Sequence, residues 1–176
     1  MRTLVLGGIR SGKSAWAELA IAEEVGPPEP VRYLATGSCP DDDPSWSQRV
    51  ADHRARRPQY WSTDETIELT AQLRQIPAPP TLIDDLGGWL TAVLDRRGWD
   101  SPVRADVDEL IDAVYAFGSP LVVVSPEAGL MVVPATGSGR RFVDEIGELN
   151  QRMAGLCDRV VLVVAGQALT IKDYDE

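Results

Sequence analysis

The segment at residues 7–14 has the composition and spacing of a loop that binds phosphate groups. It reads GGIRSGKS, which fits the pattern G-x-x-x-x-G-K-[ST], and it lies between an apolar run and a helical pattern. Glycines let the backbone wrap so that successive N–H groups face phosphate oxygens, and the helix N-terminus adds the positive end of its dipole. Lys13 is expected to reach the β- and γ-phosphates, and the Ser14 hydroxyl is expected to bind Mg²⁺. The alternative is a chance glycine turn, but Lys13 is one of only two lysines in the chain.

A pair of carboxylates closes the apolar run at residues 81–85. A nucleoside triphosphate site needs a carboxylate near Mg²⁺ at the end of a neighbouring strand, and Asp84 or Asp85 can supply it. We take Asp84 as the first choice and Asp85 as the second. The alternative role for either residue is the N-cap of the following helix, a position that aspartate favours. Spacing alone does not separate the two roles.

The single histidine of the chain, His53, lies in a segment rich in arginine. Residues 45–57 read SWSQRVADHRARR, which predicts a helix with Ser45 as its N-cap. Arg49, His53 and Arg56 stand at i, i+4 and i+7 and therefore share one helix face. Arginines on such a face can bind a triphosphate, and a neutral imidazole nitrogen is a nucleophile toward phosphorus. The alternative is a solvated helix face with a surface histidine.

These residues need a scaffold, and the order of elements along the chain predicts one. Short apolar runs predict strands at residues 3–6, 31–35, 59–63, 81–85, 121–125, 160–165 and 169–171. Helical patterns occupy residues 13–25, 45–57, 65–75, 89–97, 103–117 and 140–157. Gly166 and Gln167 are the predicted turn of a C-terminal hairpin. The alternation predicts one α/β, P-loop NTPase-like domain over residues 1–176, with a mostly parallel sheet, helices on both faces and ligands at the carboxyl ends of the strands.

Composition and net charge argue against several classes of binding partner for this protein. The 176 residues carry a net charge of −10 and the pI is near 4.6, which argues against nonspecific binding to nucleic acid or to an anionic membrane. Two distant cysteines, Cys39 and Cys157, indicate reduced thiols rather than a disulfide scaffold or a zinc site. No apolar run approaches the roughly 20 residues of a membrane span, and the first residues do not read as a signal peptide. We therefore expect a cytoplasmic protein without nucleic-acid or membrane partners.

Strings along nearly the whole chain resemble a known family, the bifunctional adenosylcobinamide kinase/adenosylcobinamide-phosphate guanylyltransferases of cobalamin synthesis. The most specific string is RVADHRARRP at residues 49–58, since the phosphate loop alone occurs in many unrelated families. The other matching strings are GGIRSGKS at 7–14, YLAT at 33–36, WSTDE at 61–65, LIDDLGGWL at 82–90, the E-x-G-x-x-x-V-P pattern at 127–134, RRFVDEIGELNQRMA at 140–154 and VVLVVAG at 160–166.

The resemblance implies a P-loop α/β fold, a homo-oligomer that is often a trimer, and two reactions on a corrinoid substrate. ATP or GTP phosphorylates the aminopropanol hydroxyl of adenosylcobinamide. GTP then guanylylates a histidine, which corresponds to His53, and the GMP passes to adenosylcobinamide phosphate to give adenosylcobinamide-GDP. With the motifs above, His53 and Lys13 are the expected catalytic residues, and Ser14 and Asp84 the expected Mg²⁺ ligands. The nucleotide contacts carried over from the family are Gly7, Gly8, Ile9, Arg10, Ser11, Gly12, Lys13, Ser14, Ala35, Thr36, Gly37, Arg54, Ala55, Arg56, Arg57, Glu65 and Asp84.

The sequence departs from the family pattern in two loops. The family pattern D-C-L-T-x-W-x-x-N reads DDLGGWLTA at residues 84–92, and the family pattern N-E-V-G reads PEAG at 126–129. Gly87, Ala92 and Pro126 thus stand where the family has side-chain hydrogen-bonding groups. Two explanations fit these departures: sequence drift in loops that take no part in catalysis, or a weakened kinase activity.

Two other functional classes fit the motifs. One is a P-loop small-molecule kinase that uses its arginines for charge stabilisation and forms no covalent intermediate. The other is a protein that binds GTP without turnover. For the general base of a kinase step, Glu127 and Asp85 are the candidates.

Overall fold

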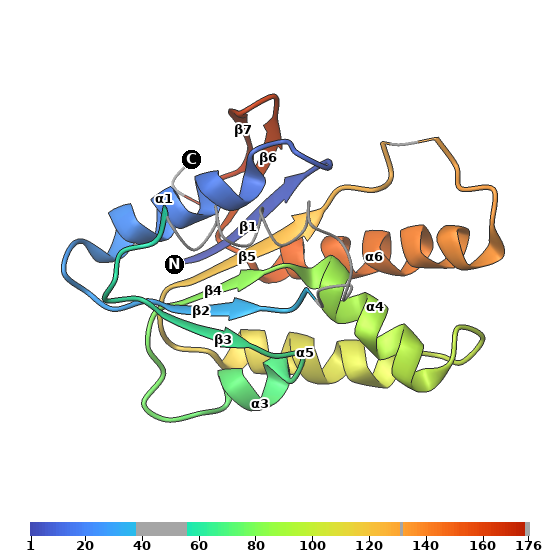
Figure 1. Cartoon of the computed structure of the whole chain (residues 1–176), viewed down its shortest axis with the longest axis horizontal. Helices are drawn as coiled ribbons and strands as arrows, with labels where there is room; N and C mark the ends of the chain where they lie inside the picture. Colours follow the sequence, from blue (N-terminus) through green and yellow to red (C-terminus); the bar gives the residue numbers. More distant parts are fainter. Residues whose placement is uncertain (38–55, 131, 175–176) are drawn as a thin grey trace.

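A mostly parallel β-sheet is the centre of the part of the chain that the computed structural model describes, residues 1–37, 56–130 and 132–174 (Figure 1). The strands in this part are β1 (Arg2–Gly7), β2 (Arg32–Ala35), β3 (Ser62–Glu65), β4 (Thr81–Asp84), β5 (Leu121–Pro126), β6 (Arg159–Val164) and β7 (Gln167–Lys172). The helices are α1 (Lys13–Val25), α3 (Leu69–Leu73), α4 (Leu86–Arg97), α5 (Arg104–Ala116) and α6 (Gly137–Leu156). This arrangement confirms the predicted α/β class with a C-terminal hairpin.

The order of the strands places the ends of distant segments side by side. The order is β3-β2-β4-β5-β1-β6-β7, and every adjacent pair is parallel except β6 and β7. The carboxyl ends of β1 to β5 therefore meet at one edge of the sheet (Figure 1). The sequence predicted a carboxylate at the end of a strand that neighbours the strand of the phosphate loop. Strand β5 lies between β1 and β4, so Asp84 at the end of β4 is one strand further from β1. Helix α1 packs on β4 and β5 as well as on β1, and it bridges this separation.

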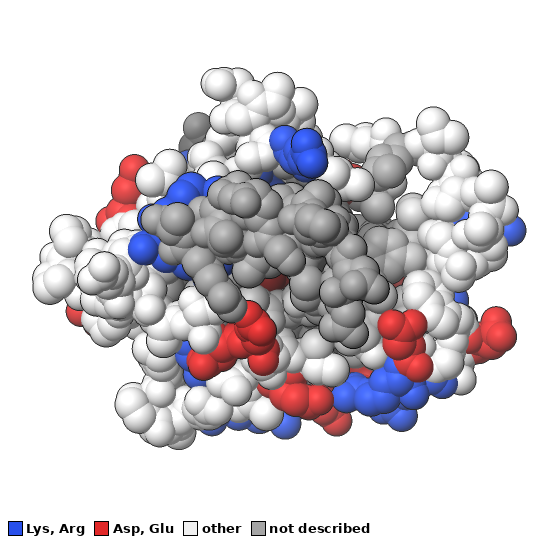
Figure 2. Space-filling model, viewed as in Figure 1, with Lys and Arg blue, Asp and Glu red and all other residues white. Residues whose placement is uncertain are grey.

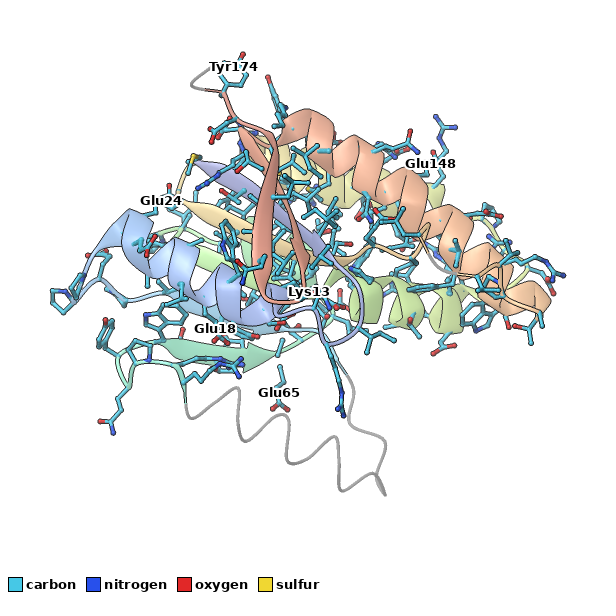
Figure 3. All side chains as sticks on the ribbon, turned by 90° about the horizontal axis from the view of Figure 1, so that it is seen from above. Lys13, Glu18, Glu24, Glu65, Glu148 and Tyr174 are labelled. Atoms are coloured by element: carbon cyan, nitrogen blue, oxygen red, sulfur yellow. The ribbon has the colours of Figure 1, made fainter. Side chains whose placement is uncertain are left out.

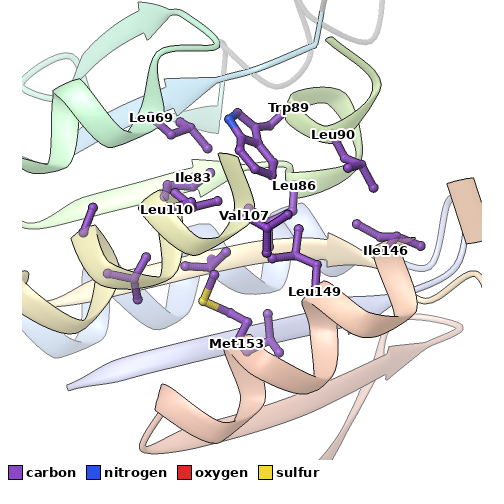
Figure 4. Packing of buried hydrophobic residues seen from close by; sticks show 14 of the residues in the cluster. Leu69, Ile83, Leu86, Trp89, Leu90, Val107, Leu110, Ile146, Leu149 and Met153 are labelled. Atoms are coloured by element: carbon purple, nitrogen blue, oxygen red, sulfur yellow. The ribbon is translucent and has the colours of Figure 1, made fainter. Parts of the chain in front are cut away.

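Two apolar layers hold helices against the two faces of the sheet. On one face, Ala17 and Ile21 of α1 pack with strand residues that include Val5, Val122 and Val161. On the other face, α3, α4, α5 and α6 enclose the larger cluster, part of which Figure 4 shows. Strand residues 121–124 are fully buried, because both faces of β5 are covered. The continuous apolar runs in the sequence reflect this two-sided burial.

Several element boundaries differ from the sequence-based expectation because local hydrogen bonds place the ends. Strand β3 begins at Ser62 rather than at Gln59, since the Trp61 N–H donates to the Pro58 carbonyl and closes a turn before the strand. The helix expected over residues 65–75 is only Leu69–Leu73, and Glu65 belongs to the end of β3. Helix α4 begins three residues earlier than expected, directly after Asp85.

The C-terminal part shows two further corrections. Helix α6 begins at Gly137 rather than at Arg140, with the Thr136 side chain accepting from the Gly139 N–H as an N-cap. The turn of the β6–β7 hairpin is Ala165–Gly166, not Gly166–Gln167. Both turn residues have positive φ, 51° and 76°, which is the conformation of a tight hairpin turn that follows the twist of its strands.

No helix in the described ranges is both long enough and apolar enough to cross a bilayer.

The packing of α5 predicts a large difference between two positions on the same helix. Leu110 is fully buried in the larger cluster, whereas Tyr115 is 71% exposed. Leu110→Ala should lower the free energy of unfolding by about 2–5 kcal/mol, because it removes apolar contacts and leaves a cavity. Tyr115→Ala, the matched control, should change it by less than about 0.5 kcal/mol. Urea denaturation measures both values; equal losses would contradict the packing described here.

Candidate nucleotide-binding site

Two glycines of the phosphate loop between β1 and α1, Gly7 and Gly12, stand where a side chain would be crowded. Gly12 has a φ of 94° and stands as the N-cap of α1. A Cβ on Gly12 would lie 3.3 Å from the Cα of Gly166, and one on Gly7 would lie 2.7 Å from the Val163 carbonyl oxygen. The Gly166 N–H also donates to the Ser11 carbonyl at 2.8 Å. The β6–β7 hairpin therefore packs against the loop and supports it.

Lys13 is one of two cations in this loop, and the other is Arg10. Its Nζ donates to the Gly8 carbonyl at 3.4 Å, so the side chain folds back along the loop (Figure 3). Its backbone N–H faces the Ser11 Oγ at 3.3 Å. The first turn of α1 contains no acidic residue of its own. The arrangement is suited to bind an anion such as a polyphosphate.

Asp84, at the carboxyl end of β4, contacts the first turn of α1. The Ser14 hydroxyl donates to its Oδ1 at 3.2 Å, and the Tyr33 hydroxyl of β2 donates to its Oδ2. Burial raises the pKa of Tyr33, and the charge of Asp84 raises it further, so the phenol stays protonated and remains a donor. One oxygen of Asp84 thus accepts from Ser14 of α1, and the other accepts from Tyr33 of β2.

Asp85 has a different set of contacts. Its side chain accepts from the Gly88 N–H at 2.9 Å and is the N-cap of α4, and its backbone N–H donates to the Thr36 hydroxyl at 3.0 Å. Burial raises the pKa of its carboxyl, and the charge of Asp84 acts in the same direction. Of the two roles that the sequence left open, the helix cap is the role in which the structure places Asp85.

A metal ion between Ser14 and Asp84 would fit the oxygen atoms present. In the described ranges no group of three or more His, Cys, Asp or Glu residues could hold a metal ion by itself. Mg²⁺ is commonly bound through one or two protein oxygens, with phosphates and water completing its shell. The hydroxyl of Ser14 and the carboxylate of Asp84 match that requirement.

Other predicted contacts gather at the same edge of the sheet. The register places Ala35 opposite both Asp84 of β4 and Glu65 of β3. Thr36 follows Ala35, is buried, and donates its N–H to the Asp84 carbonyl at 3.1 Å. The structure thus brings together residues that are 49 positions apart in the sequence, such as Thr36 and Asp85.

The arginines at the end of the segment that follows β2 are only partly within the described residues. His53, Arg54, Ala55 and most of the helix predicted over 45–57 lie outside them. Arg56 and Arg57 are described, and both pair with Glu18 of α1, at 3.1 Å and 3.6 Å. The Arg57 guanidinium also lies 3.3 Å from the centre of the Tyr33 ring, and its side chain is only 8% exposed. Figure 2 shows that basic and acidic side chains lie close to one another on the face of the molecule that it draws.

The end of β5 connects the loop to α6 through a residue that the sequence analysis did not single out. Asn150 of α6 is buried, accepts from the Ser125 hydroxyl at 2.6 Å, and donates to the Pro126 carbonyl at 3.0 Å. The next residue, Glu127, donates its N–H to the Gly7 carbonyl at 3.1 Å. The signal in the sequence was an asparagine within the apolar stripe of a helix, beside Leu149 and near Met153.

Tyr33 and Glu18 were also missed. Tyr33 reads as one more apolar residue of a buried strand, and Glu18 as one of several glutamates on α1. Their contacts with Asp84 and with the arginine pair come from segments distant in sequence, so no local pattern marks them.

The contacts of the two aspartates predict unequal effects of their amide variants. Asp84→Asn should raise the Mg²⁺ concentration for half-maximal phosphoryl transfer by roughly tenfold or more, while metal-free nucleotide binding changes little. Asp85→Asn should have a small effect, because asparagine also caps helices well. Mg²⁺ titrations of the kinase reaction and calorimetry without metal measure these quantities. A larger metal effect in Asp85→Asn would reverse the assignment.

Comparison with known proteins gives the site its context. A family model described as cobinamide kinase / cobinamide phosphate guanyltransferase matches residues 3–171. A bifunctional adenosylcobalamin biosynthesis protein CobP of Pseudomonas aeruginosa is 40% identical, with 98% of each chain covered. Proteins named CobU, with the same bifunctional description, are 35% identical in Salmonella typhimurium and 32% identical in Escherichia coli, with 98% of this chain and 100% of theirs covered. The chain therefore belongs to the cobinamide kinase / cobinamide phosphate guanyltransferase family.

Proposed function

We propose that this chain phosphorylates adenosylcobinamide with ATP or GTP, and then transfers GMP from GTP to the product through a guanylyl-histidine. The observation that carries the proposal is the contact of Ser14 with Asp84 beside Lys13, in a chain that matches the family over residues 3–171. The product would be adenosylcobinamide-GDP. We further propose a single domain that works in the cytoplasm as a homo-oligomer, with a trimer as the assembly that the resemblance implies.

In the kinase step, the chain holds the triphosphate and the acceptor is phosphorylated directly. Backbone N–H groups of the loop and the ammonium of Lys13 bind the phosphates. Mg²⁺ held by Ser14 and Asp84 would neutralise charge on the β- and γ-phosphate oxygens. The acceptor hydroxyl attacks the γ-phosphorus. The bond between the γ-phosphorus and the oxygen that bridges it to the β-phosphate breaks, and the nucleoside diphosphate leaves. Glu127 and Asp85 are the candidates to receive the hydroxyl proton; Asp85 accepts from the Gly88 N–H as the cap of α4, and Glu127 accepts from the Gly129 N–H.

In the guanylyl step, the nucleophile is a nitrogen of His53. It attacks the α-phosphorus of GTP, and pyrophosphate leaves as the nitrogen–phosphorus bond forms. An oxygen of adenosylcobinamide phosphate then attacks the same phosphorus, so that GMP is transferred and the imidazole is restored. Because His53 precedes Arg56 by three residues, and three residues of extended chain span only about 10 Å, the anchoring of Arg56 on Glu18 limits the reach of the imidazole.

The two other functional classes make different predictions with labelled GTP. A kinase without a covalent intermediate transfers label only from the γ-position. A protein that binds GTP without turnover transfers no label, and nucleotide raises its melting temperature. The guanylyl-histidine mechanism alone leaves label from the α-position on the protein.

Incubation with Mg²⁺ and GTP labelled at the α-phosphate should give an acid-labile, hydroxide-stable adduct on His53 that adenosylcobinamide phosphate discharges. His53→Ala should lose the adduct and guanylyl transfer, yet keep measurable kinase activity, because phosphoryl transfer at the loop does not use the imidazole. Lys13→Ala should lose phosphoryl transfer. Scintillation counting and peptide mapping report the results. Adduct at the wild-type level in His53→Ala, or GMP mapped to Lys13 or Lys172, would refute the assignment.

A further inference from the structure

Glu18 is a buried carboxylate on the helix that begins with the phosphate loop. It is 8% exposed and follows Ser14 by four residues, which places both on the same face of α1. Its two oxygens face the two arginines, Oε2 toward the Arg56 Nε and Oε1 toward the Arg57 Nε. A buried carboxylate is costly unless cations compensate it, so this pairing favours a position of both arginines beside α1.

Arg57 lies between Glu18 and Tyr33, the residue that donates to Asp84, the carboxylate proposed to bind the metal ion. Its guanidinium stacks over the ring of Tyr33, and its Nη1 donates to the Thr63 hydroxyl at 3.0 Å. A guanidinium over an aromatic face is held by the negative charge of that face. The tyrosine beneath it is 1% exposed and donates its hydroxyl to Asp84. The contacts thus run from Glu18 through Arg57 and Tyr33 to Asp84.

We propose that Glu18, Arg57 and Tyr33 form a positioning link that places Arg56 and Arg57 relative to the phosphate loop and Asp84. Glu18 and Tyr33 are positioning residues in this account, not catalytic residues. Glu18 positions the arginine pair that follows His53, and Tyr33 orients Asp84. The inference rests on the proposed function, because it assigns the link a role in both of the proposed steps.

Loss of the Glu18 carboxylate and loss of the Tyr33 hydroxyl should affect different steps. Glu18 pairs with the two arginines that follow His53, so we expect its loss to act mainly on the guanylyl step. Tyr33 contacts Asp84, so loss of its hydroxyl changes the metal requirement of both steps. Residues that hold a metal ligand in place commonly change metal affinity by tenfold or more when they are removed. A purely structural role would instead lower both activities together with the folded fraction.

The first test compares Glu18→Gln with Glu23→Gln, an exposed position on the same helix. Glu18→Gln should slow formation of the GMP adduct roughly tenfold or more, since small misplacements of reacting groups cost that much, and should slow the kinase step much less. Glu18→Asp, which keeps the charge, should recover part of the loss. Thermal unfolding of each variant gives the folded fraction. Equal slowing of both steps, or adduct formation at the rate of Glu23→Gln, would overturn the role of Glu18.

The second test compares Tyr33→Phe with Tyr115→Phe, which is exposed on α5. Tyr33→Phe should raise the Mg²⁺ concentration for half-maximal activity about tenfold in both steps. Calorimetry should show weaker Mg²⁺-dependent GTP binding with little change in metal-free GTP binding. An unchanged Mg²⁺ dependence in a folded Tyr33→Phe protein would overturn the role of Tyr33.

The wild-type protein separates failure of the link from failure of the proposed function. If it forms no GMP adduct, the guanylyl step is wrong, and the role of Glu18 fails with it. The role of Tyr33 is then decided by Mg²⁺-dependent GTP binding alone. If the wild-type protein forms the adduct and the variants behave like their controls, the proposed function stands and the link is wrong.

Discussion

The geometry of the candidate site depends on hydrogen bonds that Asp84 accepts from two different elements. Ser14 at the start of α1 donates to one oxygen, and Tyr33 of β2 donates to the other. Because β5 separates β4 from β1, the carboxylate does not reach the phosphate loop through strand adjacency. Helix α1 packs over β5 and β4 and carries Ser14 to it. The position of the carboxylate relative to bound phosphates therefore depends on how α1 packs on the sheet.

Close backbone approaches around this carboxylate explain part of the departure from the family pattern. A Cβ on Gly88 would lie 2.8 Å from the Thr36 Oγ1, and one on Gly87 would lie 2.8 Å from the Pro126 Cγ. Gly87 and Pro126, two of the three departures, thus lie against each other. A side chain at position 87 would require a shift of the Pro126 ring or of α4, so the two departures lie at one contact between α4 and β5.

Local signals were sufficient to predict the phosphate loop, the α/β class and most elements, because each is marked by glycine spacing or by apolar periodicity. The roles of Asp84 and Asp85 could not be separated, since they depend on whether Ser14 or the Gly88 N–H faces each side chain. Tyr33, Glu18 and Asn150 were missed because their partners are distant in sequence. Boundaries such as the start of α4 were misplaced because capping hydrogen bonds, rather than periodicity, determine them.

The central claim is that Ser14 and Asp84 hold the metal ion of a triphosphate bound at the loop, with Tyr33 orienting the carboxylate. A crystal structure with Mg²⁺ and a GTP analogue that cannot be hydrolysed tests it most directly. The account predicts Mg²⁺ about 2.1 Å from the Ser14 Oγ, on the side of Asp84 Oδ1, with the Tyr33 hydroxyl still donating to Oδ2. A metal ion bound to Asp85 instead, or a triphosphate bound away from Lys13, would contradict the account.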